Sequence, residues 1–392
     1  MNPPTVTLPT RHEKPARTPR HIPERPREAK RSGLVFSHLG PNWYASVMGT
    51  GIVATAAATL PAKVAGLHVA ATVVWVVAAL WLLLLTAAWA VHWTRHRAQA
   101  RAHADHPVMA HFYGAPPMAL LTVGAGTLAL GKDWIGPTTA LAADSVLWSA
   151  GTLTGLAVCV WIPYRVMSRH LVPPEAAFGG WLMPVVPPMV SAATGAALVP
   201  HAPAGQLRLT LLLCCYAMFG ISLLASLIII THIWGRLVHH KIGLAAMVPT
   251  LWIVLGPLGQ SVTAANGLGN AASTALPAPF ATGARVFGLL YGVPVWGFAM
   301  MWLALVVTIT LHTARIVSIP FSLTWWSFTF PVGTCVTGTS LLAAATGSDL
   351  LRWAAFLLYV LLLAGWITAA VRTTRAALRG TIFAPPLPTP LS

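Results

Sequence analysis

Ten apolar stretches divide this chain, and each is near or above the roughly 20 residues that a helix needs to cross a bilayer. Charged residues make up only 8% of the 392 residues, against about a quarter in an ordinary soluble domain. Eight acidic residues are too few to give a soluble fold of this size a charged surface. This excludes a soluble enzyme or a nucleic-acid-binding domain, despite the net charge of +16. The sequence therefore predicts an all-α membrane protein with ten transmembrane helices, at Leu39–Leu60, Leu67–Val91, Val108–Leu130, Thr139–Ile162, Phe178–Val199, Leu207–Trp234, Met247–Asn266, Val286–Leu311, Phe321–Ala345 and Leu350–Val371.

Two tails flank this membrane region, which we place at residues 37–373. Residues 1–36 are rich in Pro, Arg, Glu and Thr and have little apolar content, so we expect a disordered, basic cytoplasmic tail. No short apolar core and cleavage site follow its basic stretch, so we do not expect it to act as a secretory signal. Residues 374–392 are expected to form a short cytoplasmic tail whose last part is Pro-rich.

The distribution of Lys and Arg predicts the orientation of the spans. With ten spans both termini share one side, and the tails and loops of that side carry 19 of the 24 basic residues, leaving 5 on the other side. Basic residues concentrate in cytoplasmic loops. The split therefore predicts cytoplasmic termini in a multi-pass protein of the plasma or inner membrane.

Prolines separate the odd spans from the even ones. Odd spans begin about every 70 residues, which indicates five repeated helical hairpins. A mid-membrane proline frees a carbonyl, and the freed group needs protein or water beside it. We therefore expect the odd spans inside and the smooth even spans toward lipid, although the prolines could also merely kink packed helices. Interior prolines of odd spans are Pro116, Pro117, Pro184, Pro187, Pro188, Pro249, Pro257 and Pro331, against Pro294 alone in an even span.

The polar residues of the odd spans indicate what their centre would conduct. No Asp or Glu is expected deep in a span, since Asp144 falls near one end of the fourth. Cation and proton-coupled carriers commonly need buried carboxylates, whereas hydroxyls, amides and helix N-termini can stabilise an anion. Hydroxyls also serve neutral solutes. The expected lumen-facing polar groups are Thr50, Gln260, Ser261, Thr263, Thr329, Thr334 and Thr337.

Neither cysteines nor histidines indicate a cofactor or a metal site. The four cysteines lie inside apolar runs without a CxxC pair. His111 is the one titratable side chain that could face the lumen, although a histidine near a membrane interface is more often bonded to a neighbour. The other histidines at span ends do not form the facing pair that haem ligation needs.

Five motifs, one in each odd span, carry a family resemblance. They are PNWYASVMGTGIV at 41–53, HFYGAPPM at 111–118, WLMPVVPPMV at 181–190, LWIVLGPLGQS at 251–261 and WWSFTFPVGT at 325–334. Together they resemble the tellurite-resistance/dicarboxylate transporter family, which includes yeast malate permeases, fungal sulfite efflux pumps and plant slow anion channels. The resemblance covers the whole membrane region and excludes the N-terminal tail.

This resemblance implies five hairpins around a pseudo-five-fold central pore, transport of small anions such as malate or sulfite, and a homotrimer. It also implies an aromatic gate on the ninth span, matched by Phe330 with Phe328 as second choice. The residues expected to line the pore are Gly49, Thr50, Gly51, Pro117, Pro188, Pro257, Gln260, Ser261, Thr329 and Pro331.

Two other classes of function were weighed against anion transport. A membrane enzyme would show paired acidic metal ligands or a catalytic Ser/His set, and none is present. A proton-coupled or cation carrier of the same architecture would need a carboxylate facing the lumen. The sequence leaves the anion, the coupling ion and the choice between channel and carrier open.

Overall fold

The computed structural model describes residues 39–61 and 64–380. The predictions of a disordered tail over residues 1–36 and of the end of the C-terminal tail concern residues outside these ranges. Within them the chain is all-helical, without a strand. Eight helical segments are long and apolar enough to cross a membrane: Leu67–Arg95, Met109–Ile135, Pro137–Arg169, Gln206–His240, Ala245–Thr274, Ala278–Ile316, Leu323–Thr346 and Asp349–Leu378.

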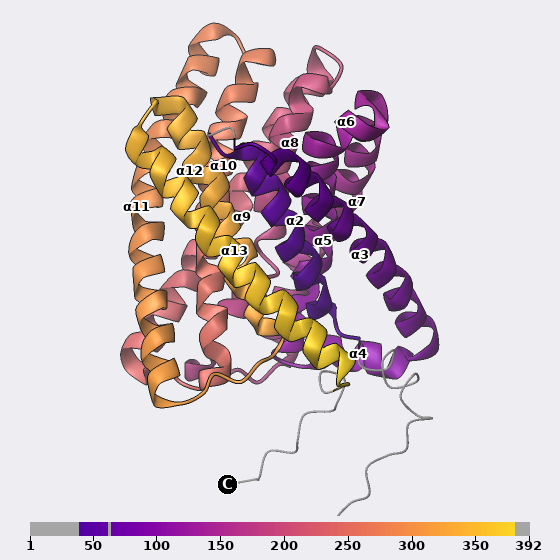
Figure 1. Cartoon of the computed structure of the whole chain (residues 1–392), viewed down its shortest axis with the longest axis vertical. Coiled ribbons are helices and arrows are strands. Elements are labelled where there is room, and N and C mark those ends of the chain that lie inside the picture. Colours follow the sequence, from indigo (N-terminus) through magenta and orange to yellow (C-terminus); the bar gives the residue numbers. More distant parts are fainter. Residues whose placement is uncertain (1–38, 62–63, 381–392) are drawn as a thin grey trace, which may run out of the picture.

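Five of these segments are long, continuous α-helices. They are α3 (Leu67–Arg95), α7 (Pro137–Arg169), α9 (Gln206–His240), α11 (Ala278–Ile316) and α13 (Asp349–Leu378). Only 22% to 33% of the most apolar window of each helix is buried. Figure 1 shows the C-terminal end of α13 and the nine-residue helix α4 (Arg97–Asp105) at the same end of the molecule, while α6 (Lys132–Ile135) lies at the other end. We call these ends the α4 end and the α6 end.

The remaining helices are shorter, broken and buried. They are α2 (Tyr44–Thr59), α5 (Ala115–Gly126), α8 (Pro187–Leu198), α10 (Leu255–Ala271) and α12 (Phe330–Thr346). In the three long segments that contain α5, α10 and α12, between 72% and 83% of the most apolar window is buried. The expected spans Leu39–Leu60 and Phe178–Val199 correspond to α2 and α8, whose α-helices of 16 and 12 residues are shorter than each of the eight segments.

A 3₁₀ segment comes before each short helix, directly or through a brief turn. These segments are η2 (Pro41–Trp43), η3 (Met109–Gly114), η6 (Gly179–Leu182), η8 (Ala245–Val254) and η10 (Leu323–Phe328). Prolines occupy the first or second position of α5, α8 and α12. A proline fits there because the first-turn N–H has no helical partner in any case. These prolines therefore mark helix starts, where the sequence indicated bends within continuous helices.

The helices that correspond to the even spans also differ from their expected limits. Pro163 lies inside α7, which continues to Arg169, so Pro294 is not the only interior proline of the long helices. The extra turns of α7 hold Arg165, which forms an ion pair with Asp105 and lies over the Trp161 ring. These contacts stabilise the helix beyond the apolar stretch on which the sequence prediction rested.

Contacts between the short helices follow a closed order. Helix α2 packs against α5, α5 against α8, α8 against α10, α10 against α12, and α12 against α2. Each long helix packs against the short helix that precedes it in the chain and against one more short helix, as α3 does with α2 and α5. The site described next lies among the five short helices.

The remaining elements are short. They are η4, a π-helical turn (Thr127–Gly131), and the 3₁₀ turns η5 (Pro174–Ala176), η7 (Val199–His201) and η9 (Ala272–Thr274).

Candidate functional site: two cavities that share Phe330

A wide cavity of about 690 Å³ lies among the short helices. Its wall includes residues of all five: Ile52 and Thr55 on α2, Thr122 on α5, Thr194 on α8, Gln260 on α10 and Thr337 on α12. At the α6 end it is bordered by the exposed side chains of Thr59, Lys132 and His201. The wide cavity therefore has a surface-exposed rim at the α6 end.

A narrow cavity of about 20 Å³ lies among the N-terminal parts of the same five segments. Its wall is mostly apolar and includes Met48, Phe112, Met183 and Ile253. This volume has room for about one water molecule. An oxyanion could not occupy it without movement of the wall.

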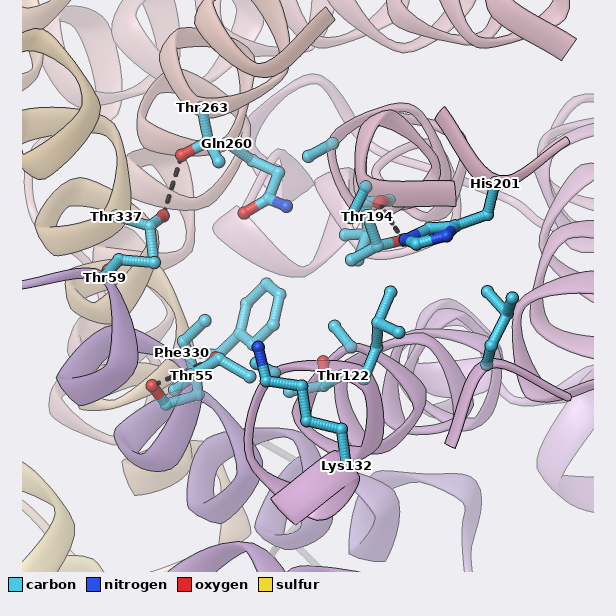
Figure 2. A pocket seen from close by; sticks show the side chains of 18 of the residues that line it. Thr55, Thr59, Thr122, Lys132, Thr194, His201, Gln260, Thr263, Phe330 and Thr337 are labelled. Atoms are coloured by element: carbon cyan, nitrogen blue, oxygen red, sulfur yellow. Dashed lines mark hydrogen bonds between the residues drawn. The ribbon is translucent and has the colours of Figure 1, made fainter. Parts of the chain in front are cut away.

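Phe330 belongs to the walls of both cavities. Its side chain is only 3% exposed, and Figure 2 shows it reaching into the wide cavity. The preceding residue, Thr329, leaves the helical conformation at φ −105° and ψ −80° and separates η10 from α12. Phe330 is therefore the first residue of α12 and stands where the wide and the narrow cavity meet.

The polar wall of the wide cavity consists mainly of hydroxyls and one amide. Thr263 and Thr337 share a hydrogen bond of 2.7 Å, and Thr122 donates to the Met118 carbonyl. Gln260 is 4% exposed and its Oε1 has no hydrogen-bond partner among the described residues. Rotation of its amide can present either an acceptor or two donors to the cavity.

The charged side chain among the residues that line the wide cavity is a lysine. Lys132 reaches in from the α6 end (Figure 2), and His201 joins it at the rim. Among the residues that line the wide and narrow cavities, none is Asp or Glu. The lysine and the Gln260 amide on this largely apolar wall favour a small anion electrostatically.

Six of the residues expected to face the lumen or to line the pore lie on these walls. Phe330, Gln260, Thr263 and Thr337 line the wide cavity, and Phe330, Pro257 and Pro331 line the narrow one. The remaining expected residues lie at helix contacts in the described structure. Thr50 donates to the Ser46 carbonyl and accepts from the Trp366 indole, which directs it toward α13.

The other expected wall residues likewise pack against neighbouring elements. Gly49 faces Thr329 and Trp326, and Gly51 faces Thr122 and Ala78. Thr329 and Ser261 donate to carbonyls of their own segments, Trp326 and Leu258. Pro117 packs near Gly155 of α7, and Pro188 is buried in α8.

Phe328, the second choice for a gate, lies in an aromatic cluster away from both cavities. Its ring meets Trp252 edge-on at 5.0 Å and Trp325 at 5.6 Å. Its backbone carbonyl faces Gly365 of α13. Phe328 therefore packs between helices.

His111 lies in a different cavity, of about 720 Å³, which is bounded by Trp181, Arg236 and Met247. Its buried ring stacks with Trp181 at 6.2 Å and meets Phe178 edge-on at 5.5 Å. His111 does not line the wide or the narrow cavity.

Sequence reasoning missed several wall residues. Thr55 and Thr59 are one helical turn apart on α2, and that spacing was the available signal. Lys132 was counted only as a loop cation, because nothing in the sequence shows that α5 continues through η4 to bring it to the rim.

Asp144 lies near the start of its helix, as the sequence predicts, but its side chain is buried. In α7 this side chain is only 1% exposed. It faces Gly124 of α5, which leaves space because glycine has no Cβ. Asp144 lies behind the wall of the wide cavity and does not line it.

Comparison with known proteins gives a family match and full-length relatives. A family model for the voltage-dependent anion channel matches residues 38–374. An uncharacterized transporter of Methanocaldococcus jannaschii is 25% identical over 352 residues, which are 89% of this chain and 96% of that protein. Sulfite efflux pumps of Arthroderma otae and Trichophyton rubrum are each 28% identical over 313 residues, 78% of this chain and 82% of the pump.

Proposed function

The chain belongs to the voltage-dependent anion channel family, and on that premise we propose that it carries small anions across a cell membrane between its five short helices, with Phe330 as the gate. Members of this family are transporters and channels, so the prediction of a transport protein rather than an enzyme is confirmed. The described helices agree with a multi-pass membrane protein.

The closed order of contacts among α2, α5, α8, α10 and α12 supports a central path. In this proposal the short segments containing α2 and α8 also cross the membrane, which gives ten spans in five hairpins with a pseudo-five-fold arrangement. A broken helix is tolerated at membrane depth where protein or a water-filled cavity surrounds it. The burial of the short helices and the exposure of the long ones meet that condition.

One observation supports the assignment of Phe330 as the gate: its side chain is part of both cavity walls. On its α6 side the path is wide and carries polar side chains among apolar ones, and on its other side the path has room for about one water. An apolar constriction of that size gates by excluding water and hydrated ions. Movement of the Phe330 ring would join the two cavities.

The substrates that fit this wall are small anions, either sulfite-type inorganic anions or C4-dicarboxylates such as malate. The Gln260 amide and Lys132 offer hydrogen-bond donors and positive charge, and none of the lining residues is a carboxylate that would repel an anion. The similarity to sulfite efflux pumps supports the inorganic anions. The flux of malate, succinate, sulfite, nitrate and chloride into proteoliposomes tests the class of anion. The same measurements with and without a proton gradient test whether transport is coupled to protons.

Replacing Phe330 by alanine tests the gate. Removal of a plugging ring should raise basal anion flux while the protein stays folded. Phe328→Ala is the matched control. It removes a phenylalanine ring two positions earlier in the chain, and that ring lies in an aromatic cluster outside both cavities. Normal folded yield of Phe330→Ala without any gain in flux would reject the gate.

Cytoplasmic termini, a plasma or inner membrane location and a homotrimer complete the proposal. The α4 end would face the cytoplasm and the α6 end the opposite side. Trp134 is 70% exposed at the α6 end, and Arg379 follows α13 at the α4 end. Cysteines introduced at these two positions should be labelled from opposite sides of the membrane, and same-side labelling contradicts the orientation. Chemical cross-linking of the protein in native membranes measures how many subunits associate and so tests the homotrimer.

A further inference from the structure

We propose that Asp144 is a proton-binding site through which the pH on the α6 side controls the anion path. Protonated Asp144 leaves the path conductive, and loss of the proton inhibits it. The control of flux rests on the proposed function, whereas proton binding itself can be tested without any transport.

Burial without a partner is the first observation. The Asp144 side chain is 1% exposed, and neither carboxylate oxygen has a hydrogen-bond partner among the described residues. A carboxylate in such surroundings lacks both water and a counter-charge, and the neutral acid avoids the cost of the buried charge. Ionisable residues of this kind inside membrane segments are by default candidates for function.

The contact with α5 is the second observation. Gly124 approaches the carboxyl so closely that a Cβ at this position would lie 2.5 Å from Asp144 Oδ1. Thr122 and Ala125, on either side of Gly124, line the wide cavity. A negative charge on Asp144 would therefore stand one helix away from an anion in that cavity.

The π-helical turn η4 begins three residues after Gly124. Turns of this kind interrupt the regular hydrogen bonds of a helix and are frequent at functional sites. Helix α7 packs against both α5 and η4, and η4 leads directly to Lys132 at the rim of the wide cavity. The charge on Asp144 can thus act on the segment that positions Lys132.

Protons have a short route from the α6 end. Asp144 lies about two helical turns from Pro137, the first residue of α7. The next residue, Ser145, lines a cavity of about 300 Å³, and Leu141 and His201 line both this cavity and the wide one. These two cavities, which share Leu141 and His201, place water-accessible space beside the α7 turn that carries Asp144.

Few other titratable groups surround the site. Helices α5 and α8 and the turn η4 contain none. On α6, Asp133 lies 3.1 Å from His68, and Lys132 lines the wide cavity. His201 on η7 remains as a second group whose titration could affect anions at the rim. The experiment therefore has to separate Asp144 from His201.

Thermal unfolding between about pH 5 and pH 8 tests proton binding. If the folded protein holds a proton on Asp144 that the unfolded chain releases, stability is greatest at low pH and is lost as the pH rises. Asp144→Asn, which imitates the protonated acid, should unfold at a temperature that depends less on pH than in the wild type. Asp349→Asn is the control, because that exposed carboxylate pairs with Arg352. An unchanged pH dependence in Asp144→Asn overturns the proposal.

Infrared spectra of the folded wild type provide a measurement that does not depend on the variant. The carbonyl stretch of a buried, protonated acid should be present near about pH 6 and disappear as the pH rises. Exposed carboxylates are already ionised at that pH. Absence of this band overturns the proposal even if Asp144→Asn fails to fold.

Anion flux at varied pH on the α6 side tests the control of the path, in a His201→Gln background. A single site changes its protonated fraction by up to about tenfold per pH unit. In the His201→Gln variant we expect the anion flux to fall several-fold as the pH rises. In the double variant that also carries Asp144→Asn, the flux should change by no more than about twofold over the same pH range. Equal pH profiles with and without Asp144→Asn refute the control of flux. Absence of anion flux from the wild type at every pH refutes the proposed function and leaves the unfolding test standing.

Discussion

Replacing Gln260 by glutamate alters the charge of the wide cavity with almost no change in shape. The side chain is 4% exposed and lines the cavity from α10, and the wall includes no Asp or Glu among its lining residues. The variant therefore adds the first fixed negative charge to this surface. Its size suits the space that the amide already occupies, so the fold should tolerate it.

The magnitude follows from the cavity. A sphere of the observed volume, 690 Å³, has a radius of about 5 Å, and at that separation two unit charges in an effective dielectric of about 20 repel by about 3 kcal/mol. Since each 1.36 kcal/mol is a factor of ten, anion occupancy should fall by about two orders of magnitude. Lys132 at the rim offsets part of this repulsion.

Initial rates of anion flux into proteoliposomes measure the effect. The glutamate must be ionised to act, so flux through Gln260→Glu should be closest to wild type in acid and fall as the pH rises. Gln206→Glu is the matched control, because Gln206 is exposed at the start of α9. If folded Gln260→Glu transports anions at the wild-type rate up to alkaline pH, the wide cavity is not the anion path.

Three further predictions concern packing and the rim. Phe328→Ala should lower the free energy of unfolding by less than the roughly 3–5 kcal/mol that loss of a fully buried ring costs, because Phe328 is only partly buried, and it should leave basal flux unchanged; chemical denaturation and flux measure the two effects. Lys132→Gln should reduce flux at low ionic strength and much less at high salt, because an exposed charge that gathers anions is screened. Gly179→Ala should lower the folded yield in size-exclusion chromatography, because a Cβ there would overlap the carbonyl of Thr250.

Much about the class of this protein was predictable from the sequence. Scarce charge and long apolar stretches are properties of whole segments, and they predict a helical membrane protein whatever the packing. The five motifs indicated the family, which the family match and the sulfite efflux pumps confirm. The placement of Phe330 rested on the resemblance, and its role as a gate stays a prediction.

The faces of the short helices were beyond the reach of the sequence. A helix buried on all sides has no polar stripe that marks its orientation, so the periodicity argument that works for surface helices fails. Thr50 and Thr55 illustrate this, since both lie on α2, yet the first accepts from Trp366 of α13 and the second lines the wide cavity. Gln260 and Ser261 are likewise adjacent, and only Gln260 is on the wall.

Asp144 shows most clearly the difference between what the sequence determines and what the tertiary structure decides. The sequence by itself determined that one carboxylate falls near the end of an apolar span, where water would ordinarily reach it. Only the tertiary structure decided that it is buried, because α5 presents Gly124 at that height and lets α7 approach closely. Burial depends on what a neighbouring helix, distant in the chain, places against a side chain, and no local pattern in α7 carries that information.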